Sequence, residues 1–158
     1  MNRLITAIVF ILLGLPLIAD GAGKPAGFAP RDKCPVCGMF VAKYPNFAAR
    51  IVYEDGSYAL FDGAKDMFTY YLNLRKYAPG KTASQIAALS VTDYYSLSLI
   101  DGFSAWYVIG SDVLGPMGKE LVSFARAADA EGFKLDHKGK RTVRFRDVTS
   151  NLIRELVE

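Results

Sequence analysis

Two Asp-Gly pairs, Asp55-Gly56 and Asp101-Gly102, each lie between two stretches in which apolar and polar residues alternate. Asp-Gly is a favoured pair in the tight turns of β-hairpins, and alternation is typical of strands with one buried face. The stretches 47–61 and 93–110 therefore each predict two antiparallel strands joined at the Asp-Gly turn.

A helical pattern follows each of these strand pairs. Residues 62–77 carry apolar side chains at helical spacing, and residues 115–133 begin with a Gly-Pro break and then show the same spacing. The alternating stretch 141–148 predicts a closing strand. Strand, turn, strand and helix thus occur twice in the same order. This order predicts an α+β fold of two related ββα(β) units packed together, about 34–90 and 91–158.

The segments around these elements have simpler interpretations. Asp62 stands in front of the first helical stretch, where a carboxylate is a favoured N-cap. Residues 78–92 are expected to connect the two units, and residues 150–158 to form a short C-terminal helix. At 158 residues, the chain suits one compact domain or two small units that share a core.

Residues 1–22 have the form of a secretory signal peptide. A short positive start precedes an apolar run that Gly14 and Pro16 interrupt, and small residues follow. The alternative is an uncleaved anchor that keeps the protein at the membrane. Residues 23–33, rich in Gly, Pro and Ala, predict an extended linker. We therefore expect a periplasmic protein whose cysteines meet an oxidising compartment.

The composition excludes several classes of function. The formal net charge is only +3 and there is no basic arm, so a nucleic-acid partner is not expected. The single histidine, His137, lies in a polar turn, where a solvated side chain is the expected role and a supplementary metal ligand is the alternative. There is no Ser-His-Asp arrangement and no phosphate-binding glycine loop. We therefore expect a binding protein rather than an enzyme.

Both cysteines lie in one short segment, Cys34-Pro-Val-Cys37-Gly-Met39. A thioredoxin-like redox pair would need a helix directly after the motif, which Gly38 and Pro45 disfavour. A zinc site needs four ligands, so a carboxylate would have to complete the set. A disulfide explains the two cysteines in an exported protein but gives no reason for Met39.

Cu(I) suits the segment best, because thiolate and thioether sulfur bind this ion well. Cys34, Cys37 and Met39 lie within six residues, and Gly38 lets the backbone fold so that the sulfurs converge. Met117 is a further candidate ligand, because it lies in a Gly-Pro-Met-Gly turn rather than on an apolar helical face. The redox pair and the structural disulfide remain as alternatives.

These segments resemble the NosL family, the accessory proteins of nitrous oxide reductase maturation. The resemblance covers CPVCGMFVAKYP at 34–45, DGSYALFDGAKDMFTYY at 55–71, AWYVIGSDVLGPMGKELVSF at 105–124 and DHKGKRTVRFRDV at 136–148. It implies a Cu(I)-binding, extracytoplasmic metallochaperone that passes copper to a reductase or to its assembly machinery. It also implies a fold of two ββαβ-type units, similar to part of organomercurial lyase.

The resemblance further implies a set of metal ligands. Cys37 and Met39 match the family's Cys-Gly-Met segment, Met117 matches its Pro-Met-Gly segment, and Cys34 is matched in many members. His137 falls where the family often shows His-Gly-Gly, and here reads His-Lys-Gly. Many relatives are lipoproteins, whereas this chain has no lipobox cysteine. We therefore expect a soluble periplasmic protein, or one anchored through a retained signal segment.

Overall fold

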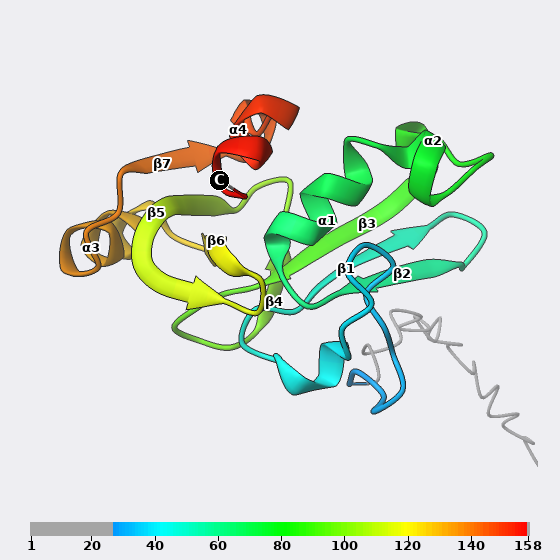
Figure 1. The fold of residues 1–158 in the computed structure, drawn as a ribbon, viewed down its shortest axis with the longest axis horizontal. Coiled ribbons are helices and arrows are strands. Elements are labelled where there is room, and N and C mark those ends of the chain that lie inside the picture. The colour runs from blue at the N-terminus through cyan, green and yellow to red at the C-terminus, as the bar shows by residue number, and fades with distance from the viewer. Residues whose placement is uncertain (1–26, 158) are drawn as a thin grey trace, which may run out of the picture.

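The computed structural model describes residues 27–157, whose strands form two antiparallel sheets (Figure 1). The first sheet has the strand order β2-β1-β3-β4 and the second has the order β6-β5-β7. The strands are β1 (Ala49–Tyr53), β2 (Tyr58–Phe61), β3 (Ile86–Thr92), β4 (Leu99–Asp101), β5 (Trp106–Gly115), β6 (Gly118–Phe124) and β7 (Arg141–Arg144). The predicted signal peptide and the start of the predicted linker lie outside the described residues.

Four helices accompany the sheets in the part of the chain that the structure describes. They are α1 (Ala64–Tyr71), α2 (Leu74–Tyr77), α3 (Ala127–Asp136) and α4 (Ser150–Glu155). The order β1-β2-α1-β3 recurs as β5-β6-α3-β7, and in each sheet the first strand of the unit lies between the other two. The predicted α+β fold of two related units is therefore confirmed.

The first unit follows its sequence pattern closely. Strands β1 and β2 pair antiparallel around the predicted turn, where Gly56 has a φ of +80° and the Asp55 carboxylate accepts from the Ser57 amide. Helix α1 then buries Met67 and Phe68 completely. The predicted helix 62–77 is divided, because α1 ends at Tyr71 and α2 begins at Leu74.

The predicted hairpin over residues 93–110 is wrong. Strand β4 pairs with β3 in the first sheet, whereas β5 pairs with β6 and β7 in the second. The turn at Asp101-Gly102 therefore carries the chain from one sheet to the other. Its carboxylate still accepts from two backbone amides, those of Phe103 and Ser104, so the local turn is as expected and only the strand pairing differs.

The predicted helix over residues 115–133 is also wrong in its first half. Strand β6 occupies Gly118–Phe124 and pairs with β5 around a tight turn at Pro116-Met117, and the helix begins only at Ala127. Residues 120–124 are all buried, so both faces of the strand are covered. A strand that is buried on both faces need not alternate apolar and polar residues, and the apolar positions Leu121, Val122 and Phe124 also fit helical spacing.

Three smaller expectations also need correction. The predicted connector 78–92 contains β3, which lies between β1 and β4. The predicted strand 141–148 ends at Arg144 and continues as a 3₁₀ turn. Asp62 does not cap α1, because Gly63, which has no side chain, is the N-cap residue. The short C-terminal helix is confirmed as α4.

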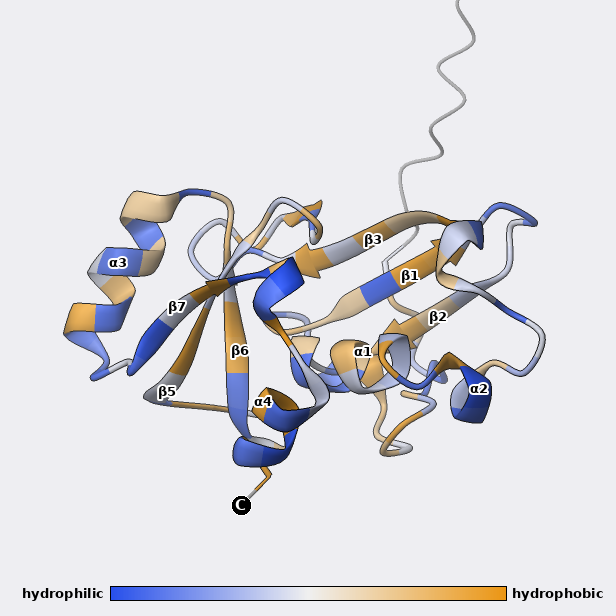
Figure 2. Ribbon diagram, turned by 90° about the horizontal axis from the view of Figure 1, so that it is seen from above, coloured by the Kyte–Doolittle hydropathy of each residue, from blue (hydrophilic) through white to orange (hydrophobic). Residues whose placement is uncertain are grey.

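One hydrophobic core joins the two units. Phe68 of α1 lies 5.1 Å, between ring centroids, from Tyr107 of β5 and also 5.1 Å from Phe145. Buried residues of both sheets and of α4 belong to the same cluster, and a smaller cluster lies under α3. Figure 2 shows hydrophobic stretches along β1, β3 and β6, whereas α2 is largely hydrophilic. None of the helices within residues 27–157 has the length and hydropathy needed to cross a membrane.

Candidate metal centre

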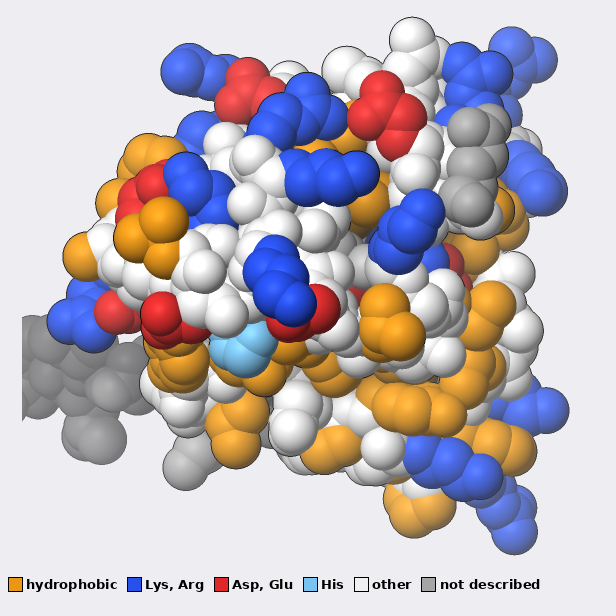
Figure 3. Space-filling model, turned by 60° about the vertical axis from the view of Figure 1, so that its left-hand side comes forward, with side chains coloured by type: hydrophobic (Ala, Val, Ile, Leu, Met, Phe, Trp, Pro, Cys, Tyr) orange, Lys and Arg blue, Asp and Glu red, His pale blue; other side chains and the backbone are white. Residues whose placement is uncertain are grey.

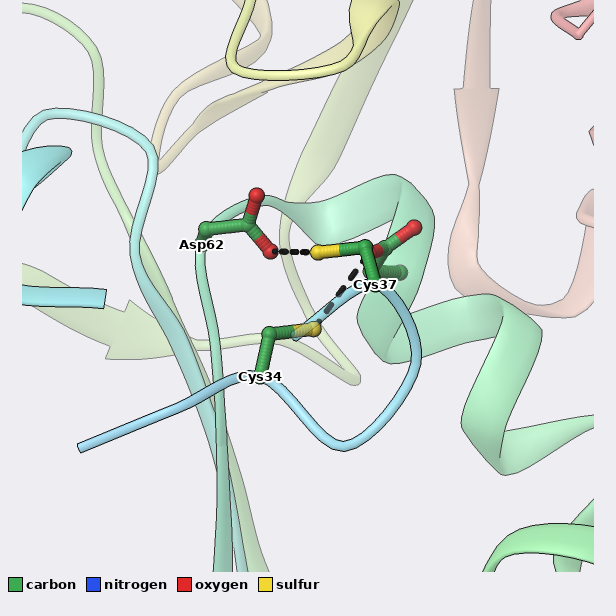
Figure 4. Close-up of side chains that lie close together, drawn as sticks. Cys34, Cys37 and Asp62 are labelled. Atoms are coloured by element: carbon green, nitrogen blue, oxygen red, sulfur yellow. Dashed lines mark hydrogen bonds between the residues drawn. The ribbon is translucent and has the colours of Figure 1, made fainter. Parts of the chain in front are cut away.

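The two cysteines lie in a tight loop of residues 32–41. The amide of Cys34 donates to the carbonyl of Met39 and the amide of Gly38 donates to the carbonyl of Cys34, each at 2.9 Å. Gly38 has a φ of +81°, a conformation that side-chain-bearing residues rarely adopt, so glycine is required at this turn. The loop directs both sulfur atoms toward the start of α1 (Figure 4).

The start of α1 presents two buried carboxylates to this loop. Asp62 precedes the helix and is 1% exposed, and Asp66, in the first helical turn, is 7% exposed. The thiol of Cys37 donates to Asp62 Oδ1 and the thiol of Cys34 donates to Asp66 Oδ2, each at 3.3 Å (Figure 4). One potential ligand atom from each of the four residues lies within 4.8 Å of the other three.

Burial dominates the electrostatics of this cluster. It raises the pKa of Cys34 well above the ordinary value and raises the pKa of Cys37 to about 12, with the neighbouring carboxylates acting in the same direction. Burial also raises the pKa of Asp66, although the hydrogen bonds from the two thiols oppose this change. Without a metal ion, the cluster therefore holds its sulfurs as thiols that donate to carboxylates.

Asp62 has a carboxylate oxygen that is left without a partner. Within the described residues, its Oδ2 is buried and makes no hydrogen bond. A buried carboxylate oxygen of this kind is costly unless something compensates its charge. A cation between the four side chains would do so, and it would displace the two thiol protons. The donor set therefore fits a metal ion.

Both cysteines are free thiols in this structure, and they differ in exposure. Cys34 is buried at 2% exposure, whereas Cys37 is only partly covered. Cys37 is therefore the sulfur that a reagent or a partner can reach from outside, while Cys34 lies behind it among core residues.

The two predicted methionine ligands lie on different elements. Met39 is half-buried and belongs to the cysteine loop. Met117 is 48% exposed at the tip of the β5–β6 hairpin, and its carbonyl accepts from Lys65 Nζ at 2.7 Å. Since Lys65 lies next to Asp66 in α1, the hairpin tip is attached to the helix that carries the carboxylates.

His137 is placed elsewhere. It ends α3, its Nδ1 lies 3.1 Å from Asp112 Oδ1, and its ring lies 4.4 Å from that of Phe133. Figure 3 shows the imidazole, in pale blue, at the surface beside charged side chains. His137 is not part of the four-residue cluster.

The sequence interpretation missed Asp62 and Asp66 as site residues. Asp62 was expected to cap the helix, and Asp66 was not singled out. Their spacing of four residues at a helix start is the signal that could have identified them, because it places both carboxylates on one side of the chain. That signal gains meaning only when the cysteine loop is known to lie opposite.

Comparisons with known proteins find one family over most of the chain. The model of the NosL family matches residues 25–153. The copper-binding lipoprotein NosL of Stutzerimonas stutzeri is 31% identical over 134 residues, which cover 84% of this chain and 70% of that protein.

The chain is also similar to solved structures. The crystal structure of the copper chaperone NosL from Shewanella denitrificans superposes with a TM-score of 0.67 at 26% identity, over 80% of this chain and 96% of that one. The solution structure of apo-NosL from Achromobacter cycloclastes matches with a TM-score of 0.46 at 25% identity, over 66% of this chain and 87% of that one.

Proposed function

Because the chain belongs to the NosL family, we propose that it is an exported copper chaperone that binds Cu(I) at the cysteine cluster and passes it to a copper enzyme. The observation that carries the proposal is the convergence of the Cys34 and Cys37 sulfurs beside two buried carboxylates. The relatives' names supply the metal, since one is called a copper-binding lipoprotein and another a copper chaperone.

Sulfur atoms are the proposed Cu(I) ligands. Cys34 and Cys37 would supply thiolates, and Met39 and Met117 thioethers, a set that suits a soft monovalent ion. Met39 belongs to the same loop as the cysteines, and the backbone of Met117 is attached to α1 through Lys65, which supports their inclusion. The carboxylates would not be Cu(I) ligands, because this soft ion prefers sulfur to carboxylate oxygen.

A divalent ion such as Zn²⁺ is the second candidate for the cluster. Two thiolates and two carboxylates make a four-ligand set of the kind that zinc accepts, and the four side chains are already gathered. Asp62→Asn and Asp66→Asn should weaken zinc binding more than Cu(I) binding, because carboxylates are ligands for zinc but poor ones for Cu(I).

Release to a partner requires an accessible site. Cys37 is partly covered and Met117 is about half exposed, whereas Cys34 is buried, so an incoming ligand would reach these two residues before Cys34. We propose transfer by ligand exchange to a client such as nitrous oxide reductase or its assembly machinery, with no catalysis by the chaperone itself.

Two alternatives make different predictions. A thiol-disulfide oxidoreductase needs a reactive thiolate, but burial raises the pKa of Cys37 to about 12, which opposes that chemistry. A non-catalytic domain with a Cys34–Cys37 disulfide would bind no Cu(I) after reduction. Reduction of an insulin disulfide tests the first alternative, and Cu(I) titration tests the second.

The main test is an anaerobic titration of the reduced protein with Cu(I) against a chromogenic chelator. Met39→Leu and Met117→Leu should each lower the affinity, because leucine keeps the side-chain volume but removes the sulfur. Met67→Leu is the matched control, since Met67 is fully buried in the core, and it should leave the affinity unchanged. Parental affinity in both ligand variants would refute the proposed ligand set.

The proposed export has a separate measurement. The intact mass of the protein recovered from the periplasmic fraction should correspond to a chain cleaved near residue 22. An uncleaved chain in the membrane fraction would favour anchoring through the N-terminal segment instead.

A further inference from the structure

Lys65 is a buried cation that joins helix α1 to the β5–β6 hairpin. It is 4% exposed, and its Nζ donates to the carbonyls of Met117 and Lys119, each at 2.7 Å. These carbonyls lie on either side of Gly118, which has a φ of +82°. One ammonium group therefore holds the tip of the hairpin. Lysine is rarely buried, because leaving water is costly for its charge, and here hydrogen bonds to carbonyls compensate part of that cost.

Glu120 attaches the same two elements from the other side. Its Oε1 accepts from the Lys65 amide at 2.6 Å and from the Leu121 amide at 2.9 Å. Glycines permit this close approach, because a Cβ on either Gly63 or Gly115 would come within 2.9 Å of the Glu120 side chain. The start of α1 and the hairpin are thus in direct contact along Lys65 and Glu120.

This contact connects the two parts of the proposed copper site. Asp66, the residue after Lys65, accepts the Cys34 thiol, and the Lys65 ammonium lies on the Met117 carbonyl. Met117 is 48% exposed on a hairpin tip, a place where a side chain would otherwise sample many positions. Fixing its backbone lowers the entropy that metal binding would have to remove.

We infer that Lys65 is a positioning residue for the copper site, which holds the hairpin so that the Met117 thioether lies over the cysteine loop. This inference rests on the proposed function, in which Met117 is a ligand. Lys65 acts through Met117 and does not bind the metal itself. Glu120 supports it by fixing the backbone from which the Lys65 side chain extends.

The first experiment tests the attachment without copper. Lys65→Met keeps most of the side-chain volume but removes the ammonium, so amide hydrogen exchange over residues 114–119 should become at least about tenfold faster. Thr92→Val is the matched control, because it removes another buried side chain-to-carbonyl hydrogen bond, the 2.7 Å contact with Ala48, far from the hairpin in sequence. It should leave exchange over residues 114–119 unchanged.

The second experiment is a double-mutant cycle on Cu(I) affinity. Lys65→Met should weaken binding by about 10- to 100-fold, as loss of an outer partner does at other metal sites. Met117→Leu should weaken it by a similar factor, and the double variant should bind no more weakly than the weaker single variant. X-ray absorption should show one sulfur fewer around copper in each case, and Lys65→Arg should restore most of the affinity.

The outcomes separate this inference from the proposed function. Unchanged hydrogen exchange in Lys65→Met would overturn the attachment. Faster exchange with additive losses of affinity would show that Lys65 does not act through Met117, and would overturn the positioning role. Faster exchange with full Cu(I) affinity in Met117→Leu would instead show that the proposed ligand set is wrong, and the positioning role would fall with it.

Discussion

At the scale of single residues, Glu120 is a carboxylate enclosed by protein. It is 3% exposed, and burial raises its pKa from 4.5 to about 7, against the opposing effects of the amides of Leu121 and Lys65 and of the Lys65 charge. Between pH 4.5 and 7 the folded protein therefore keeps a proton that the unfolded chain has already lost. Glu120 consequently makes the free energy of unfolding fall as the pH rises through this window.

Glu120→Gln should remove that pH dependence. When the pH is raised from 5 to 8, the free energy of unfolding of the parent should fall, relative to that of the variant, by something on the order of 3 kcal/mol. Each pKa unit corresponds to about 1.4 kcal/mol. Urea denaturation of both metal-free proteins at the two pH values measures the difference. Glu54→Gln, at an exposed turn position, is the control and should show no comparable change. Equal pH dependence of parent and Glu120→Gln would contradict the prediction.

The candidate site could be predicted in part from single residues. Cys34 and Cys37 converge as their spacing and Gly38 indicated, because a short loop limits where its side chains can lie. Asp62 and Asp66 could not be found in this way, since their role depends on a contact with a loop about thirty residues away. The ligand roles of Met39 and Met117 stay predictions until copper binding is measured.

At the scale of elements, the β5–β6 hairpin can approach α1 closely because Gly63 has no side chain. A Cβ on Gly63, the N-cap of α1, would lie within 2.9 Å of Glu120 Cδ and closer still to its Oε2. Gly132 in α3 has nothing within 4 Å of the corresponding position. The same substitution should therefore have opposite effects at the N-cap of α1 and in the interior of α3.

Gly63→Ala should destabilise the protein by about 1–3 kcal/mol, because the buried Glu120 side chain has to move. Gly132→Ala should stabilise it by about 0.5–1 kcal/mol, since alanine restricts the unfolded chain and favours the helix. Thermal or urea denaturation of both variants checks the pair. A stabilising effect at residue 63 would show that the close packing against Glu120 does not hold in solution.

The elements that could be predicted are those that local residues determine. The hairpin of β1 and β2 needs only its Asp55-Gly56 turn and its alternating strands. The prediction of a hairpin around Asp101-Gly102 was wrong because β4 pairs with β3, and this pairing depends on the whole sheet. Strand β6 was mistaken for a helix because Leu121, Val122 and Phe124 also fit helical spacing, and β3 lies in a stretch with little alternation of apolar and polar residues.

At the scale of the whole molecule, the two units depend on one core. Tyr107 and Phe145 of the second half pack on Phe68 of the first, and the residues around them form a single cluster. Neither unit can bury these aromatic rings without the other. We therefore expect one cooperative unfolding transition for the full chain.

A fragment of residues 27–104, which holds all four strands of the first sheet, should not fold alone. It would lose every residue that the second half contributes to the shared core and would expose the face of α1 that carries Phe68. Each large side chain contributes about 1.5–3 kcal/mol of burial, so several such losses together remove the small net stability of a domain. Circular dichroism and one-dimensional NMR of the fragment measure this directly. A dispersed spectrum with a cooperative transition would show that the first unit is an independent domain.

The repeat of ββαβ units also shows how one architecture serves two purposes. In each unit two residues separate the second strand from the helix, so Asp129 takes the place of Asp66, and Ala125 that of Asp62. Asp129 is paired with Arg126 at 2.7 Å, on the outside of the protein. In the second unit the equivalent carboxylate therefore forms a surface ion pair, and it is the β5–β6 hairpin of this unit that contacts α1. The two related units therefore contribute different parts: the first provides the buried carboxylates that face the cysteine loop, and the second provides the hairpin that Lys65 attaches to α1.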